Sequence, residues 1–269
     1  MGADPSDDRR FVFETSWVFK PFIFASLRAI IALYAFVTIF FIFGWRGTHN
    51  GSVANDRSFS YFTNLTYWGI AFYFLVAAIH TFIYAAKGRS IVFEKLPRCF
   101  RVLHSLFYTT VTNFPFLVLI VYWAILYEGP WYPVVFDAWS NVSQHAMPPI
   151  FSLFELIFST APAQPWLHLP FLFLILLLYL SLAYLTHKTQ GFYSYSFLDP
   201  GKHGEHNNRV VAYSFGIAAA TVVIFGITHL ISWIRLRYTR EKTKFSRVMP
   251  RLNGASEVET GMVERDQSK

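Results

Sequence analysis

The chain has 269 residues, of which 54% are hydrophobic, 20% aromatic and only 14% charged. About a quarter of the residues of soluble domains are charged, so this composition excludes an ordinary soluble domain and a disordered chain. The single cysteine, Cys99, excludes a disulfide scaffold. The net charge is +7, but the chain has too little polar surface for its basic residues to form a patch that binds nucleic acid. The composition predicts a polytopic membrane protein.

Six apolar stretches are long enough, or nearly so, to cross a bilayer, which takes about 20 helical residues. They predict an all-α fold with six transmembrane helices at 22–45, 59–86, 100–127, 141–159, 166–187 and 210–234. The stretch 141–159 is the weakest, because polar side chains and two prolines interrupt it. We expect a polar leader at 1–20, a membrane domain at 21–236 and a basic polar tail at 237–269. The leader has four acidic residues and no apolar core, so we do not expect a signal peptide.

The distribution of Lys and Arg predicts the orientation of these helices, because cytoplasmic loops carry an excess of positive charge. With six crossings, 17 of the 23 basic residues fall on the side of the two termini and five on the other side, with Arg28 inside the first helix. Both termini are therefore predicted to be cytoplasmic. The sequon at Asn50 would then face the lumen or the exterior.

This orientation places Thr63, His145 and His187 in one layer, in the half of the membrane away from the termini. A lone threonine in a membrane helix usually bonds a carbonyl of its own helix, and a lone histidine near a helix end is usually a packing residue. Together they form a hydroxyl nucleophile with a base of suitable pKa. This pattern favours a Thr/His hydrolase acting on a lipid ester.

Other polar residues at membrane depth leave two rival functions open. Glu155, Asn113 and Arg28 would line a polar path in a transporter or scaffold, although no internal repeat is visible. Arg28 alone is most simply interpreted as a snorkelling anchor. A haem electron carrier would pair His80 with His104 and His145 with His187, and His229 completes the set of histidines at the cytoplasmic end.

Three segments resemble those of a known family. They are Tyr61-Phe62-Thr63, the spaced set Trp139, Asn141, His145 and Glu155, and the run from His187 through Gly191 to Asp199. In this order and spacing they are similar to the androgen-induced and androgen-dependent membrane protein family, whose members are threonine hydrolases of fatty acid esters of hydroxy fatty acids. A weaker fourth likeness is Phe114-Pro115 followed by Tyr122-Trp123. The likeness covers the second to fifth predicted helices, whereas the leader, the first loop and the tail lie outside it.

The resemblance implies that Thr63 is the nucleophile and His145 the base of an intramembrane ester hydrolase. We expect Asn64 or Asn141 to stabilise the oxyanion or orient the base, and His187 and Glu155 to support the site. No cofactor or metal is expected, although the sequence leaves a His145–His187 metal pair open. The expected partners are a fatty acid ester and membrane lipids, not nucleic acid. The oligomeric state stays open, and so does the choice between endoplasmic reticulum and plasma membrane.

Overall fold

The computed structural model describes residues 12–49 and 51–239, and over these residues the protein is all α-helical, without a sheet. Five helices are long and apolar enough to cross a membrane. They are α1 (Pro21–Thr48), α3 (Phe62–Lys87), α5 (Arg98–Val121) with its continuation to Leu126, α8 (His168–Gln190) and α9 (Asn207–Thr239). These helices confirm the predicted all-α class and indicate a multi-pass integral membrane protein.

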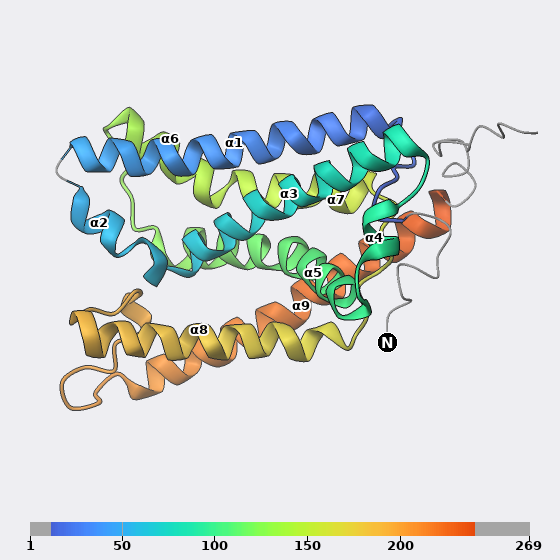
Figure 1. The fold of residues 1–269 in the computed structure, drawn as a ribbon. Coiled ribbons are helices and arrows are strands. Elements are labelled where there is room, and N and C mark those ends of the chain that lie inside the picture. Colours follow the sequence, from blue (N-terminus) through green and yellow to red (C-terminus); the bar gives the residue numbers. More distant parts are fainter. Residues whose placement is uncertain (1–11, 50, 240–269) are drawn as a thin grey trace, which may run out of the picture.

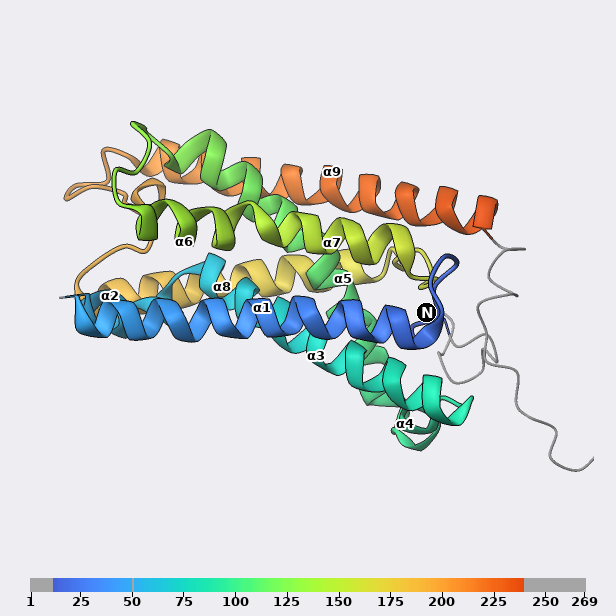
Figure 2. The same ribbon diagram turned by 90° about the horizontal axis from the view of Figure 1, so that it is seen from above.

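The stretch predicted as the fourth span is not one helix. It is split into α6 (Val135–His145) and α7 (Met147–Phe158), which run end to end alongside α1 (Figure 2). Proline has no amide hydrogen to donate and clashes with the carbonyl four residues before it. Pro148 and Pro149 therefore cannot continue α6, but they fit the first turn of a new helix. The prediction of a single helix over 141–159 is wrong for this reason.

Short elements gather at the two ends of the bundle (Figure 1). One end, which we call the α2 end, holds α2 (Ser52–Asp56), α6 and the loop 191–206. The other, the α4 end, holds α4 (Ile91–Lys95) and the first described residues. The remaining short turns are η1 (Ser58–Ser60), the π-helical η2 (Tyr122–Leu126) and η3 (Ser196–Leu198).

The segment 12–20 packs onto the α4 end of the bundle. The Phe13 side chain is buried, and Thr15 and Thr160 join their hydroxyls at 2.6 Å. Ser16 forms an isolated β-bridge with Ser159, and the Trp17 indole Nε1 donates to a carbonyl of α7. Residues 12–20 of the expected leader are therefore bonded to the end of α7 and to the residues just after it.

The polar side chains of α5 join helices within the bundle. Asn113 donates from Nδ2 to the Thr109 carbonyl at 2.7 Å and accepts a hydrogen bond from Thr228 of α9 at 3.0 Å. Gln164 donates to the Thr112 hydroxyl at 3.1 Å. Buried polar groups need such partners, and in the structure Asn113 ties α5 to α9.

Candidate functional site

A polar chamber of about 610 Å³ lies at the α2 end of the bundle. It lies where the start of α3, the end of α6 and η2 meet α2 and the loop after α8. Its lining residues are Arg46, Gly51, Val53, Ala54, Arg57, Tyr61, Thr63, Asn64, Tyr122, Leu126, Gln144, His145 and Tyr195. Thr63, Asn64 and His145, three of the six predicted site residues, thus share one cavity.

Thr63 is the second residue of α3, which begins after the extended residue Tyr61. The amides in the first turn of a helix have no partner within the helix. The Thr63 amide donates instead to the Tyr195 hydroxyl at 3.4 Å. The Thr63 side chain therefore stands at the rim of a helix start, facing the chamber.

His145 is the last residue of α6, and two contacts fix its ring. Its Nδ1 lies 2.9 Å from the Asn141 carbonyl oxygen, and the ring stacks on Tyr122 with centroids 3.6 Å apart. A carbonyl oxygen only accepts, so Nδ1 carries the hydrogen and Nε2 keeps its lone pair. This is the tautomer that a general base needs. Within the described chain, Thr63 and His145 share the chamber but are not hydrogen-bonded to each other.

Of the two asparagines predicted for the site, one lines the chamber and the other does not. Asn64 lines the chamber, donates to the Ser58 carbonyl at 2.9 Å and accepts from Gln144 at 2.8 Å, which ties α3 to α6. Asn141 lies outside the lining and donates to the Tyr132 hydroxyl at 2.8 Å. Asn141 reaches the site only through its carbonyl, which orients His145.

His187 and Glu155 do not line the chamber. His187, in the last turn of α8, stacks on Tyr193 with ring centroids 3.8 Å apart. Glu155 is fully buried in α7 and is paired with Arg28 of α1. The structure therefore does not bring either residue to Thr63.

The partners of Arg28 show that it is not a snorkelling anchor. Its side chain is fully buried, and Nε donates to Glu155 at 3.1 Å while Nη2 pairs with the other carboxylate oxygen. Nη1 donates to the Phe13 carbonyl at 2.8 Å and to the Thr81 hydroxyl at 2.6 Å. Tyr73 donates to the same carboxylate at 3.1 Å. The interpretation of Arg28 as an anchor in the headgroup region is therefore wrong.

The histidines predicted for the cytoplasmic end lie among aromatic side chains, and one of them also bonds a carbonyl. His80 and His104 have ring centroids 5.5 Å apart, and Phe13 and Phe93 pack edge-on against His104. His229 bonds the Gln164 carbonyl at 2.9 Å. Nowhere in residues 12–49 or 51–239 do three or more metal-ligating side chains gather.

A second cavity, the apolar pocket, of about 280 Å³, adjoins the chamber between α5, α8 and α9. It is lined mainly by Leu, Val, Ile and Phe side chains. Four residues line both cavities: Thr63, Tyr122, Leu126 and Tyr195. Thr63 therefore stands where a polar space meets an apolar one.

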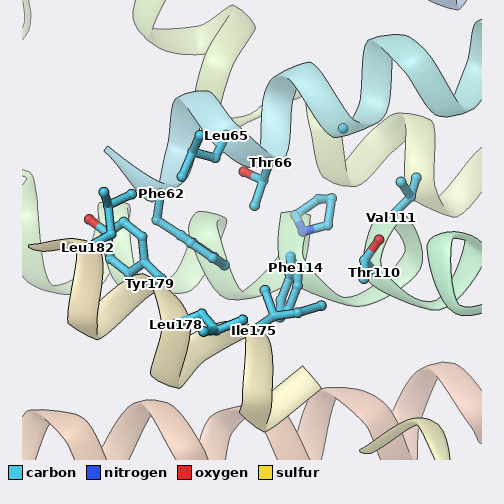
Figure 3. Close-up of a pocket in the computed structure, with 12 residues that line it drawn as sticks. Phe62, Leu65, Thr66, Thr110, Val111, Phe114, Ile175, Leu178, Tyr179 and Leu182 are labelled. Carbon is cyan, nitrogen blue, oxygen red and sulfur yellow. The ribbon is translucent and has the colours of Figure 1, made fainter. Parts of the chain in front are cut away.

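A third cavity, the lateral groove, of about 370 Å³, lies between α3, α5 and α8 (Figure 3). Phe62 and Tyr179, whose ring centroids are 5.0 Å apart, line both this groove and the apolar pocket. The two rings form the partition between these cavities.

Sequence reasoning missed several chamber residues. Tyr122 and Tyr195 lie in segments that resemble the family. Each is surrounded in sequence by other aromatic residues, so the sequence does not indicate which ring faces the chamber. In the sequence, Arg46 and Arg57 are two of the five basic residues predicted to lie on the side away from the termini. Their signal was that they are the only two basic residues between the first two predicted helices.

Comparison of the chain with models of protein families, with curated proteins and with solved structures gives no match.

Proposed function

We propose that the protein is an intramembrane ester hydrolase in which Thr63 is the nucleophile and His145 the general base. One observation carries the proposal: Thr63 stands between a polar chamber that holds His145 and an apolar pocket. An ester with a long acyl chain would place its chain in the pocket and its polar part in the chamber. The resemblance of both residues to the family of threonine hydrolases supports the same roles.

The chemistry needs only side chains of the chain and one water. The Thr63 oxygen attacks the acyl carbonyl while its proton passes to Nε2 of His145. The imidazolium returns this proton to the leaving alcohol, which leaves an acyl-enzyme. Water then attacks the acyl carbonyl while His145 accepts its proton, and His145 passes this proton to the Thr63 oxygen as the fatty acid leaves. Of the two asparagines only Asn64 lines the chamber, and its Nδ2 donates to the carbonyl and the hydroxyl of Ser58. To stabilise the oxyanion, Asn64 would have to exchange its 3.1 Å bond to the Ser58 hydroxyl for one to the substrate.

We propose six membrane crossings, with α6 and α7 together forming the fourth. In this arrangement the bias of Lys and Arg places both termini in the cytoplasm and the chamber on the opposite face. Asn50, the sequon residue, lies outside the described residues, but its neighbours Gly51 and Val53 line the chamber. The membrane is that of the endoplasmic reticulum or the cell surface.

The test is hydrolysis of a long-chain fatty acid ester by the purified protein. We expect Thr63→Ala and His145→Ala to abolish it, with Thr110→Ala and His49→Ala as matched controls, because neither control residue lines the chamber. A fluorophosphonate probe should label the protein at Thr63, and Thr63→Ala should abolish the labelling. Full activity in folded Thr63→Ala protein would overturn the proposal.

No specific observation supports the two rival functions, a transporter or scaffold and a haem electron carrier. The buried pair of Arg28 and Glu155 has satisfied partners rather than an open polar path. For a haem carrier, His145 and His187 each have one ring face covered by a tyrosine. A Soret band in the purified protein would favour the haem carrier over the hydrolase.

A further inference from the structure

Tyr195 lies beside Thr63, at the border between the chamber and the apolar pocket. It belongs to the loop 191–206 and immediately precedes η3. Its ring stacks on Phe197, with centroids 5.3 Å apart and planes 5° apart, and meets Tyr61 edge-on at 5.9 Å. These contacts fix the ring, so the place of its hydroxyl is fixed as well.

The amide of Thr63 donates to a side chain, whereas the next two amides donate to the backbone. The amides of Asn64 and Leu65 bond the Tyr61 carbonyl at 3.1 and 3.2 Å. The Thr63 amide bonds the Tyr195 hydroxyl oxygen at 3.4 Å. Typical N–H···O bonds measure about 2.9–3.0 Å. This bond is long, so a stronger acceptor could replace the Tyr195 oxygen at the amide.

The Tyr195 hydroxyl keeps a hydrogen to donate. An amide only donates, so in the bond with Thr63 the Tyr195 oxygen is the acceptor and its own hydrogen points elsewhere. The hydroxyl also interacts with the side chains of Thr63 and Tyr179. Tyr179 donates its own hydrogen to the Ser60 carbonyl at 3.1 Å and can therefore accept that of Tyr195. Hydrogen bonds to a charged acceptor are about twice as strong as those to neutral ones, so a negative oxygen beside Thr63 would take this hydrogen.

We propose that Tyr195 is a further catalytic residue, whose hydroxyl donates to the oxyanion together with the Thr63 amide. The inference rests on the proposed function and deepens it. As the Thr63 oxygen bonds the acyl carbon, the carbonyl π electrons move to the carbonyl oxygen and the Thr63 proton passes to His145. Two donors 3.4 Å apart can both lie about 2.9 Å from one oxygen. The negative oxygen therefore accepts from both, as it does from the nucleophile's own amide in serine proteases.

This role for Tyr195 leaves Asn64 where it is. Asn64 keeps its bonds to the Ser58 carbonyl and hydroxyl and to Gln144, which hold the start of α3 against α6. Tyr195 exchanges only a neutral acceptor for a charged one. The exchange takes place at the rotatable hydroxyl hydrogen and leaves the ring on Phe197.

The first experiment removes the hydroxyl and keeps the ring. We expect Tyr195→Phe to lower kcat for a long-chain fatty acid ester about 100-fold or more, as loss of one oxyanion donor does, with little change in KM. Tyr193→Phe is the matched control, because Tyr193 lies in the same loop and lines neither the chamber nor the apolar pocket. It should leave both constants unchanged, and the Tm of each variant checks its folding.

The second experiment separates a catalytic role from a packing role. Dodecyl trifluoromethyl ketone forms a hemiketal when the Thr63 oxygen bonds its carbonyl carbon, the ketone oxygen takes the electron pair and His145 takes the proton. Dodecyl methyl ether has the same chain and no carbonyl to attack. Tyr195→Phe should weaken inhibition by the ketone about 100-fold and change inhibition by the ether less than about twofold. The two inhibition constants do not depend on the folded fraction of the protein.

Failure of this inference and failure of the proposed function give different results. Undiminished kcat in Tyr195→Phe, or equal weakening of both inhibitors, would overturn the role of Tyr195. With Thr63→Ala inactive, the hydrolase would still stand. Full activity of folded Thr63→Ala would refute the hydrolase, and the oxyanion donor with it.

Discussion

Glu155 is held by charge and hydrogen bonds rather than by apolar packing. Removing one partner of a buried ion pair leaves an uncompensated charge, which costs far more than the intact pair contributes. Arg28 has other partners in Phe13 and Thr81, but these are neutral. The pair therefore determines whether α1 and α7 can lie together.

We expect Glu155→Gln to lower the free energy of unfolding by about 3 kcal/mol, measured as thermal stability in detergent. Glu94→Gln is the control, since it breaks the ion pair of Glu94 with Arg89, whose side chain is 67% exposed, and should cost less than about 1 kcal/mol. Because Glu155 lies outside the chamber, the folded fraction of Glu155→Gln should keep the proposed esterase activity. Loss of activity in fully folded protein would restore a role for Glu155 in the chemistry.

Glu14 makes stability depend on pH. Burial raises the pKa of its carboxyl to about 7, against the lowering effect of the Ser90 hydrogen bond and the Arg28 charge. Between the ordinary value near 4.5 and 7, the folded state holds a proton that the unfolded chain gives up. Stability therefore falls as pH rises through this window, by about 3 kcal/mol in total.

The difference in Tm between wild type and Glu14→Gln isolates this effect. Measured from pH 5 to pH 8, the wild type should lose stability relative to the variant as pH rises. The change should be complete just above pH 7. Glu94→Gln keeps Glu14 and should therefore lose stability relative to Glu14→Gln as the wild type does. A difference between wild type and Glu14→Gln that does not vary with pH would contradict the assignment.

At the scale of elements, the segment 12–20 packs against several helices and holds the α4 end of the bundle together. It contacts the end of α7 through Ser16 and Trp17, and Phe13 enters the aromatic cluster around His104 and Tyr108. Its contacts come from four helices, α1, α4, α5 and α7, so it closes the α4 end of the bundle. Phe13, Thr15 and Ser16 of this segment are thereby buried with the core of the bundle.

Phe13→Ala should lower the free energy of unfolding by about 3 kcal/mol, because it empties a buried site of a large ring. Val18→Ala is the control, since Val18 is 49% exposed and should change stability by less than about 0.5 kcal/mol. Thermal melting of the two variants under one condition gives the comparison. Equal stability of both variants would show that burial of Phe13 does not contribute to the stability of the fold.

The break between α6 and α7 is a feature that hydropathy did not predict, since it indicated one helix over 141–159. The paired prolines interrupt the apolar stretch 141–159, and the preference of proline for the first turn of a helix agrees with the observed start of α7 at Met147. Hydropathy alone could not predict that helix begins at Val135, because the residues before Asn141 are mixed in polarity. The position of His145 at the end of a helix follows from this break.

At the scale of the whole molecule, the two ends of the bundle should face different compartments. Cys99, the one cysteine of the sequence, is exposed at the start of α5 near the α4 end. In sealed cells a membrane-impermeant maleimide should label Cys99 only after permeabilisation. Lys202 lies in the loop at the α2 end, so Lys202→Cys in a Cys99→Ser background should be labelled in sealed cells if the protein is at the cell surface. If it is in the endoplasmic reticulum, opening the plasma membrane alone should expose Cys99 and leave Lys202→Cys protected until the reticulum is opened as well. The reverse pattern would invert the topology and move the chamber to the cytoplasm.

Length and apolarity were enough to predict five of the spans, because each is visible in a local window of sequence. The layer shared by Thr63 and His145 followed from helix direction, and both line one chamber. Contacts between distant residues could not be predicted. Nothing near Arg28 indicates that its partner lies 127 residues further along the chain, and nothing near Arg46 indicates that it faces the same space as Thr63.

The pair of Arg28 and Glu155 also has a consequence for synthesis of the protein. At about 5–20 residues per second, the ribosome adds the intervening 127 residues in roughly 6–25 s. During that time α1 sits in the bilayer with an unmatched guanidinium, at a cost of up to about 3 kcal/mol on insertion scales. The apolar remainder of α1 has to offset this cost by itself. Completion of the bundle must therefore wait for the second half of the chain, and a nascent chain stopped before α7 would be a substrate for quality control.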